Sequence, residues 1–229
     1  MNIFQTHKSL DYVKKNPELK KAVYSWYIYK KKGYNYYFYN NRDRDLFMKQ
    51  KAVLINSQIW EAYNKLPLQV MKADLWRYCI IYMYGGVYAD CDTICLKNPA
   101  IFNTNALLTI VPENNTHLCQ WVFSAPSKSP ILKTIIDESV DRILNTNDFN
   151  QQHIIHYLTG PEVFTNGVEK YLENKKKPTF HEKKNYFNYP DRILKVFDYN
   201  VFHKNIVKHL FYGQKNDGWF ADRKKMLEK

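Results

Sequence analysis

The longest regular hydrophobic pattern runs from residue 70 to residue 84 and has helical spacing. The large apolar side chains that recur every three or four positions are Trp76, Cys79, Ile80 and Met83. This spacing predicts an amphipathic helix with one stripe facing the core. Gly85-Gly86 is the predicted end of the helix, because glycine tolerates the left-handed conformation found at helix ends.

A short apolar strand is predicted after the double glycine, and it leads into Asp90-Cys91-Asp92. Asp74 and Arg77 share a helix face and lie roughly 12–17 Å back from the helix end, at about 1.5 Å per residue. If the strand runs back along the helix at about 3.3 Å per residue, it has covered roughly 13–20 Å when it reaches Asp90 and Asp92. The two pairs are therefore expected to meet. Paired carboxylates at the end of a buried strand suit a divalent cation that is shared with phosphate oxygens.

The rest of the chain alternates between strand-like and helical patterns. Strands are predicted at residues 3–7, 34–39 and 107–111, and helices at 19–31, 44–50, 58–64, 130–144 and 161–171. Thr159-Gly160-Pro161 is a turn that opens the last helix, and the polar, basic segment 175–190 is predicted to be a loop. This alternation favours an α/β layered fold with a mixed, largely parallel central sheet, in a single domain over residues 1–229.

Charge and hydropathy narrow the class of protein. The chain has a formal net charge of +12 over 229 residues, which permits nucleic acid, an anionic membrane or an anionic substrate as a partner. The lysines are dispersed and no nucleic-acid-binding fingerprint accompanies them, so a solvated surface is the preferred interpretation. No apolar run has membrane-spanning length and no signal peptide is recognised, so a soluble, cytoplasmic protein is expected.

Cysteine and histidine patterns give little sign of a further metal or redox site. The four cysteines include no CxxC pair; Cys79 falls on the apolar helix face and Cys91 on the strand, which favours reduced, buried thiols. His153 and His156 are three apart, yet no third ligand is apparent nearby, and a structural role is preferred. G-x-S-x-G, P-loop and GxGxxG motifs are absent.

Four segments together resemble a known family. The string KADLWRYCIIYMYGGVYADCD, residues 72–92, resembles the DxD sugar-binding region of glycosyltransferase family 32. IFQTH at residues 3–7 is similar to the family's first strand, residues 159–161 to its TGP turn, and HLFYGQKNDGW at residues 209–219 to its C-terminal segment. The family includes fungal mannosyltransferases, and its site resembles that of the large clostridial glucosylating toxins.

The resemblance implies a GT-A fold, a nucleotide-sugar donor, a manganese or magnesium ion and retention at the anomeric carbon. By position it implies that Asp74 and Arg77 contact the donor sugar, and that Asp90 reaches the ribose, the sugar and the metal. It further implies nucleotide-sugar contacts from Thr6, His7 and Tyr88.

The remaining implied roles concern the metal and the glycosidic bond. Asp92 would ligate the metal directly, Trp219 would lie near the glycosidic oxygen, and Asp217, Gln214 or His209 would complete the metal or phosphate shell. Two positions depart from the family pattern: His7 stands where tryptophan is usual, and the serine before the C-terminal tryptophan is replaced in Asp217-Gly218-Trp219.

The sequence therefore predicts a metal-dependent glycosyltransferase. It is expected to move a hexose or N-acetylhexosamine from a nucleotide sugar, uridine more readily than guanosine, to a glycan, lipid or protein hydroxyl. Two alternatives stay open at this point. One is a metal-dependent nucleotidyltransferase or pyrophosphatase acting on nucleotide sugars, and the other is a non-catalytic, basic nucleic-acid-binding module.

Overall fold

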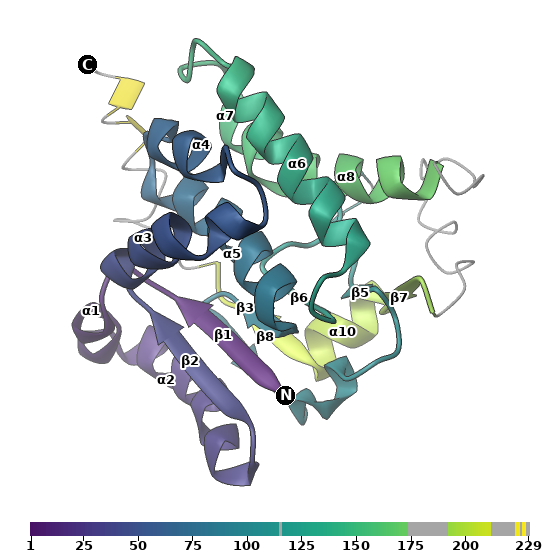
Figure 1. Ribbon diagram of the computed structural model, residues 1–229. Helices are drawn as coiled ribbons and strands as arrows, with labels where there is room; N and C mark the ends of the chain where they lie inside the picture. The colour runs from purple at the N-terminus through teal and green to yellow at the C-terminus, as the bar shows by residue number, and fades with distance from the viewer. Residues whose placement is uncertain (115, 174–191, 212–222, 225, 228–229) are drawn as a thin grey trace.

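A six-stranded mixed sheet forms the centre of the computed structural model, which describes residues 1–114, 116–173, 192–211, 223–224 and 226–227 (Figure 1). The sheet order is β2-β1-β3-β6-β5-β7. These strands are β1 (Asn2–Thr6), β2 (Asn35–Tyr39), β3 (Gly86–Ala89), β5 (Leu108–Ile110), β6 (Val122–Ala125) and β7 (Leu194–Val196). β6 runs antiparallel to both of its neighbours, and the other pairings are parallel. The predicted α/β class with a mixed, largely parallel sheet is confirmed.

Helices cover both faces of this sheet. One face carries α3 (Asn41–Gln50), η2 (Ala52–Leu54), α4 (Ile59–Lys65), α5 (Gln69–Tyr84), α6 (Pro130–Asn145), α7 (Ile154–Leu158) and α8 (Pro161–Glu173). The elements of the other side are α1 (Leu10–Lys15), α2 (Pro17–Tyr27), η1 (Ile28–Lys32), η3 (Pro99–Phe102), α10 (Tyr199–Asn205) and the β4 (Thr93–Cys95)–β8 (Val207–His209) pair. Figure 1 shows α3, α4, α5 and α6 on one side of β1 and β2, with α2 on the other.

Alternating side chains of the central strands divide the core into two layers. Phe4, Tyr88 and Phe123 pack among the helices around α5. Their neighbours Ile3, Val87 and Val122 pack on the opposite face with α2 and α10. Successive strand residues point to opposite faces, so the period of two seen here follows from strand geometry.

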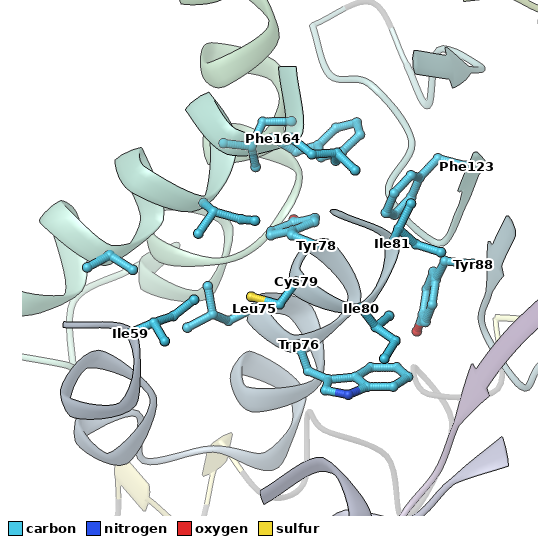
Figure 2. Packing of buried hydrophobic residues seen from close by; sticks show 14 of the residues in the cluster. Ile59, Leu75, Trp76, Tyr78, Cys79, Ile80, Ile81, Tyr88, Phe123 and Phe164 are labelled. Atoms are coloured by element: carbon cyan, nitrogen blue, oxygen red, sulfur yellow. The ribbon is translucent and has the colours of Figure 1, made fainter. Parts of the chain in front are cut away.

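Helix α5 lies in the middle of the larger layer and is not amphipathic. Every residue from Ala73 to Ile81 is buried. Figure 2 shows Leu75, Tyr78 and Ile81 of α5 among side chains from α4, α8 and the sheet. The prediction of a single core-facing stripe was therefore wrong. The polar residues Asp74 and Arg77 are buried as well, where they form an ion pair with each other.

The double glycine is required where α5 ends and β3 begins. Gly85 has φ +62° and Gly86 has φ +115°, conformations that residues with a Cβ rarely adopt. A Cβ on Gly86 would lie 2.4 Å from the carbonyl oxygen of Asn2 in β1. A Cβ on Gly85 would lie 2.6 Å from the amide nitrogen of Ser127. The chain can therefore turn from helix into sheet here only because both side chains are absent.

Several predicted boundaries change for identifiable reasons. Helix α3 begins at Asn41 because Asn40 and Asp43 form a capping box. The helix predicted over 19–31 is α2, which begins at Pro17 and gives way to the 3₁₀ turn η1 after Tyr27. Cys91 lies in the turn beyond β3 rather than on the strand.

Other expectations concern β6, the cysteines and the segments outside the described residues. The sequence did not predict β6. Free thiols are confirmed, since Cys79, Cys91, Cys95 and Cys119 form no disulfide. The predicted loop 175–190 lies outside the described residues. Within the described part of the chain, no helix combines the length and the hydropathy needed to cross a bilayer.

Candidate active site

A cavity of about 320 Å³, here called the cleft, opens where the parallel strands end. Its wall includes Thr6 at the end of β1, His7 directly after it, Asn41 after β2 and Asp90 after β3. Ligands of open α/β sheets bind outside the carboxyl ends of the strands, so the cleft occupies the position that this class of fold uses. The sequence-predicted residues Asp74, Arg77, Tyr88, Asp92 and His209 also line it.

Asp74 and Arg77 form a buried ion pair on α5. Arg77 Nη2 lies 2.8 Å from Asp74 Oδ1, and the two side chains are 5% and 3% exposed. The same nitrogen lies 3.3 Å from Asp90 Oδ1. Arg77 Nη1 also donates to the carbonyl of Gln120, at 3.2 Å. The helix pair and the strand-end aspartate therefore meet as the sequence predicted, and their ion pairs are buried rather than on the surface.

The environment of Asp74 changes its acidity. Burial is the largest influence and raises the pKa of Asp74 to about 7, although Arg77 opposes the shift. Thr159 Oγ1 donates to Asp74 Oδ2 at 3.1 Å, which brings the TGP turn to the carboxylate. Arg77 and Thr159 thus fix the Asp74 carboxylate from two sides.

Asp90 is held by its own side chain and by its backbone. The Tyr88 hydroxyl donates to Asp90 Oδ1, and the Arg77 guanidinium carbon lies 4.6 Å from the centroid of the Tyr88 ring. The Asp90 amide donates to the Trp121 carbonyl at 2.8 Å. Burial raises the pKa of Asp90, and the positive charge of Arg77 acts in the opposite direction. Tyr88 is therefore both a buried core residue and part of the cleft.

Asp92 and His209 are brought together by a strand pair that is remote in sequence. Thr93 of β4 pairs with His209 of β8, which places His209 Nε2 at 3.2 Å from Asp92 Oδ1. Burial alone would lower the pKa of His209, but the hydrogen bond and charge of Asp92 outweigh it and raise that pKa. Ligand atoms of Asp90, Asp92 and His209 all lie within 4.8 Å of one another.

This donor set fits a divalent metal ion. Carboxylate oxygens bind Mg²⁺ and Mn²⁺, and an imidazole nitrogen beside them suits a transition metal better than Mg²⁺. Glu113 also lines the cleft and lies close enough for its charge to act on His209. The residues present therefore form a candidate site for a divalent cation, as the predicted cofactor requires.

Thr6 and His7 lie on the β1 side of the cleft. Thr6 Oγ1 donates to the Tyr39 carbonyl at 2.7 Å. The His7 ring stacks on Tyr12 with centroids 5.0 Å apart and an angle of 18°. Burial lowers the pKa of His7 to about 4, so the imidazole is neutral at physiological pH.

Some predicted site residues are not placed, and some contacts were missed. Asp217, Gln214 and Trp219 lie outside the described residues. The sequence did not predict two contacts of the ion pair. The Gln120 carbonyl accepts from Arg77, and the Thr159 hydroxyl donates to Asp74. The sequence marks Thr159 only as part of the TGP turn and gives no local signal for Gln120, because both residues reach α5 through tertiary packing. His153 and His156 are not part of a metal-ligating group among the described residues.

Comparisons with known proteins show which family the chain resembles. A family model described as a glycosyltransferase sugar-binding region containing a DXD motif matches residues 5–116, just under half of the chain. The chain is 25% identical over 177 residues to the initiation-specific alpha-1,6-mannosyltransferase of Candida albicans, covering 63% of this chain and 46% of that protein. It is 29% identical over 140 residues to the enzyme of the same name in Schizosaccharomyces pombe, covering 51% and 35%.

The chain therefore spans less than half the length of these two relatives. Among solved structures, the PaToxG glycosyltransferase superposes with a TM-score of 0.49 at 17% identity, covering 76% of this chain and 69% of that chain. The family model and the two relatives confirm the resemblance to glycosyltransferase family 32. The α/β class expected of a GT-A fold is confirmed by the sheet order.

Proposed function

We propose that this chain is a metal-dependent glycosyltransferase that moves a hexose from a nucleotide sugar to a hydroxyl acceptor. The observation that carries the proposal is the convergence of Asp90, Asp92 and His209 within 4.8 Å, beside the buried Arg77. A cation site next to a buried guanidinium is the arrangement that a leaving diphosphate needs, because negative charge develops on it in the transition state.

Asp90, Asp92 and His209 would hold the cation. When bound, Mn²⁺ supplies Lewis-acid stabilisation of the departing diphosphate. The protein's own part is to fix the three ligands before the substrate arrives. Asp90 is fixed through Tyr88, Arg77 and the Trp121 carbonyl, and His209 through its strand pairing and its contact with Asp92.

Arg77 and Asp74 would orient the donor sugar. Arg77 presents a planar fork of donors whose position is set by Asp74, Asp90 and the Gln120 carbonyl. Asp74 accepts from Thr159 and can accept further hydrogen bonds from sugar hydroxyls. A neutral sugar held at two such groups has one orientation toward the acceptor, which is how positioning lowers the barrier.

The stereochemical outcome is proposed to be retention by a same-face reaction. In such a reaction the departing diphosphate takes the proton of the acceptor hydroxyl while the new glycosidic bond forms on the same face of the sugar. A trapped glycosyl-enzyme adduct would contradict this hypothesis, because it requires a protein nucleophile.

The identities of sugar, nucleotide and acceptor remain predictions. The two curated relatives are named mannosyltransferases, which makes a mannosyl donor the first one to test. Uridine before guanosine, N-acetylhexosamine as a second sugar, and a glycan, lipid or protein acceptor stand as predicted from the sequence. The cytoplasmic location and the single domain stand likewise.

One set of binding and transfer assays tests the proposal. With Mn²⁺ present, a UDP- or GDP-sugar is expected to raise the unfolding temperature, because a ligand of the native state stabilises it by mass action. Transfer of the monosaccharide should release an intact nucleoside diphosphate. Asp92→Asn should reduce turnover by about 10²–10³-fold, in line with removal of a group that stabilises transition-state charge.

Asp137→Asn is the matched control, because Asp137 pairs with Lys133 on the exposed surface of α6. It should leave turnover unchanged. Release of pyrophosphate instead of a diphosphate would indicate a nucleotidyltransferase. Salt-dependent nucleic-acid binding that survives Asp92→Asn, without sugar transfer, would indicate a binding module.

A further inference from the structure

Eight lysines gather on the surface that α1, α2 and η1 form beside β1 and β2, here called the basic face (Figure 1). All eight are exposed: Lys8, Lys14, Lys15, Lys20, Lys21, Lys30, Lys31 and Lys32. The acidic residues between residues 8 and 32 are Asp11 and Glu18, so eight lysines against two carboxylates leave a charge of +6. Half of the net charge of +12 therefore lies on 25 of the 229 residues.

The charge of the basic face is largely left without counter-charges from the described residues. Lys14 is the only one of the eight with a carboxylate partner there, Asp11 at 3.9 Å. Helix α6 is different, because its exposed Lys133 pairs with Asp137 at 2.6 Å. A surface that serves solubility alone mixes both signs, as α6 does, whereas a surface of one sign attracts a partner of the opposite charge.

Helix α2 adds two exposed tyrosines to the middle of the basic face. Its apolar side chains are buried against the sheet, so Lys20, Lys21, Tyr24 and Tyr27 are left on the solvent side. Tyr24 is 59% exposed and Tyr27 is 41% exposed, with ring centroids 6.2 Å apart. Tyrosine has an apolar ring and a polar tip, which suits the boundary between water and lipid, and lysine side chains accompany it there.

The chemistry of the basic face fits an anionic bilayer better than a nucleic acid. It contains no arginine, since the first arginine of the chain is Arg42. The arginine fork recognises individual phosphates of nucleic acids, whereas a lysine is a point charge that needs no particular geometry. A layer of anionic headgroups is a diffuse negative surface, and each basic residue near it strengthens binding by about fivefold.

We propose that the basic face docks this protein on an anionic lipid bilayer. The lysines lie over the headgroups, and the rings of Tyr24 and Tyr27 enter the interface between them. Lys8, Tyr12 and Leu19 of the same segment also line the cleft, so docking holds the cleft at the bilayer surface. The proposal is independent of the proposed function, because it uses none of the candidate metal ligands.

Vesicle co-sedimentation of the full chain tests the proposal. Vesicles of phosphatidylcholine and phosphatidylserine should bind the wild type, and vesicles of phosphatidylcholine alone should not. High salt should release the protein, because salt screens the attraction. Lys20→Glu combined with Lys21→Glu should weaken binding by at least about tenfold. Tyr24→Ser should weaken binding severalfold at every salt concentration, because it removes a ring from the interface and changes no charge.

Lys49→Glu combined with Lys51→Glu is the matched control. Both lysines are exposed at the end of α3, on the other side of the sheet, and the two substitutions change the net charge by the same amount. This variant should keep most of the vesicle binding. Both double variants should keep the wild-type unfolding temperature, because all four lysines are on the surface.

Three results would overturn the proposal. The first is that phosphatidylserine vesicles do not bind the wild type. The second is an equal loss of binding in the two double variants, because net charge rather than the basic face would then be responsible. The third is tighter binding of RNA or duplex DNA than of vesicles at the same salt concentration, lost in the Lys20→Glu, Lys21→Glu variant, which would indicate a nucleic-acid surface.

Asp92→Asn separates this proposal from the proposed function. It should reduce sugar transfer and leave vesicle binding unchanged, because Asp92 is not part of the basic face. Loss of vesicle binding in Asp92→Asn would contradict the assignment to the basic face. Vesicle binding with the expected response to the lysine variants, in a protein that transfers no sugar, would support the docking surface while the proposed function fails.

Discussion

The His209 imidazole stacks on the Trp121 indole with ring centroids 4.5 Å apart and an angle of 19°. The same tryptophan accepts the backbone amide of Asp90 through its carbonyl, at 2.8 Å. One residue of the loop before β6 therefore orients two of the three candidate metal ligands, which come from segments more than a hundred residues apart.

This contact predicts that Trp121 controls metal affinity without touching the metal. Trp121→Leu should weaken Mn²⁺ binding by about 10–100-fold, the usual effect of losing a residue that orients a ligand. Trp121→Phe keeps a flat ring under His209 and should restore most of the affinity. Calorimetric titration with Mn²⁺ alone, at a temperature at which both variants are folded, measures their metal affinities. Equal affinity in Trp121→Leu and wild type would show that His209 does not depend on the stack.

The ion pair of Arg77 is expected to be critical for stability as well as for activity. Arg77→Met leaves the buried carboxylates Asp74 and Asp90 without their cation, which should cost roughly 3–5 kcal/mol of unfolding free energy. Urea unfolding gives this difference.

A surface pair supplies the control. Lys133 and Asp137 are 38% and 43% exposed, and Lys133→Met should change stability by about 0.5 kcal/mol or less. If the two substitutions cost the same, the Arg77 pair is not buried as described. Arg77→Lys keeps the charge but not the fork, and should lower kcat/KM while destabilising less than Arg77→Met.

The lowered pKa of His7 gives a stability effect with a defined sign. Between pH 6.5 and about 4 the unfolded His7 binds a proton and the folded one does not, so stability falls as the pH falls through this window. The difference between the two pKa values corresponds to about 3.5 kcal/mol at most, at about 1.4 kcal/mol per unit.

His7→Asn should therefore be less sensitive to acid than the wild type. Urea unfolding of both proteins at pH 7.5 and at about pH 4.5 isolates His7, because the carboxylates whose pKa values are raised are common to both. The stability difference between the proteins should shift toward His7→Asn as the pH falls. A difference that is constant with pH would mean that His7 is accessible to protons in the folded state.

The sequence predicted the part of the site that is local. Asp74 and Arg77 meet Asp90 because a helix and a strand of matching length run back past each other, and both lengths can be counted along the chain. The burial of α5 on all sides could not be read in the same way. From the sequence alone, Asp74 and Arg77 could be surface positions. In the fold they are buried and form hydrogen bonds with Thr159 and Gln120, which are remote in sequence.

Contacts made through strand pairing lay beyond the sequence pattern. β6 is four residues long, and its place between β3 and β5 depends on antiparallel pairing with both rather than on its own composition. His209 reaches Asp92 only through the β4–β8 register. The buried state of Arg44 depends likewise on α3 meeting the first residue of α5, Gln69.

The double glycine allows a last prediction, in which steric contact and backbone strain can be separated. Gly86 at φ +115° would place a Cβ 2.4 Å from the Asn2 carbonyl oxygen, in the strand β1 that carries Thr6 to the cleft. Gly33 at φ +84° has nothing within 4 Å of an added Cβ. Gly33→Ala should therefore cost only the strain of the left-handed backbone, about 1–2 kcal/mol. Gly86→Ala should cost clearly more and should also weaken Mn²⁺ binding, because β1 and β3 must move apart beside Asp90. Urea unfolding and Mn²⁺ titration measure the two effects, and equal costs at the two glycines would contradict the close approach of β3 to β1.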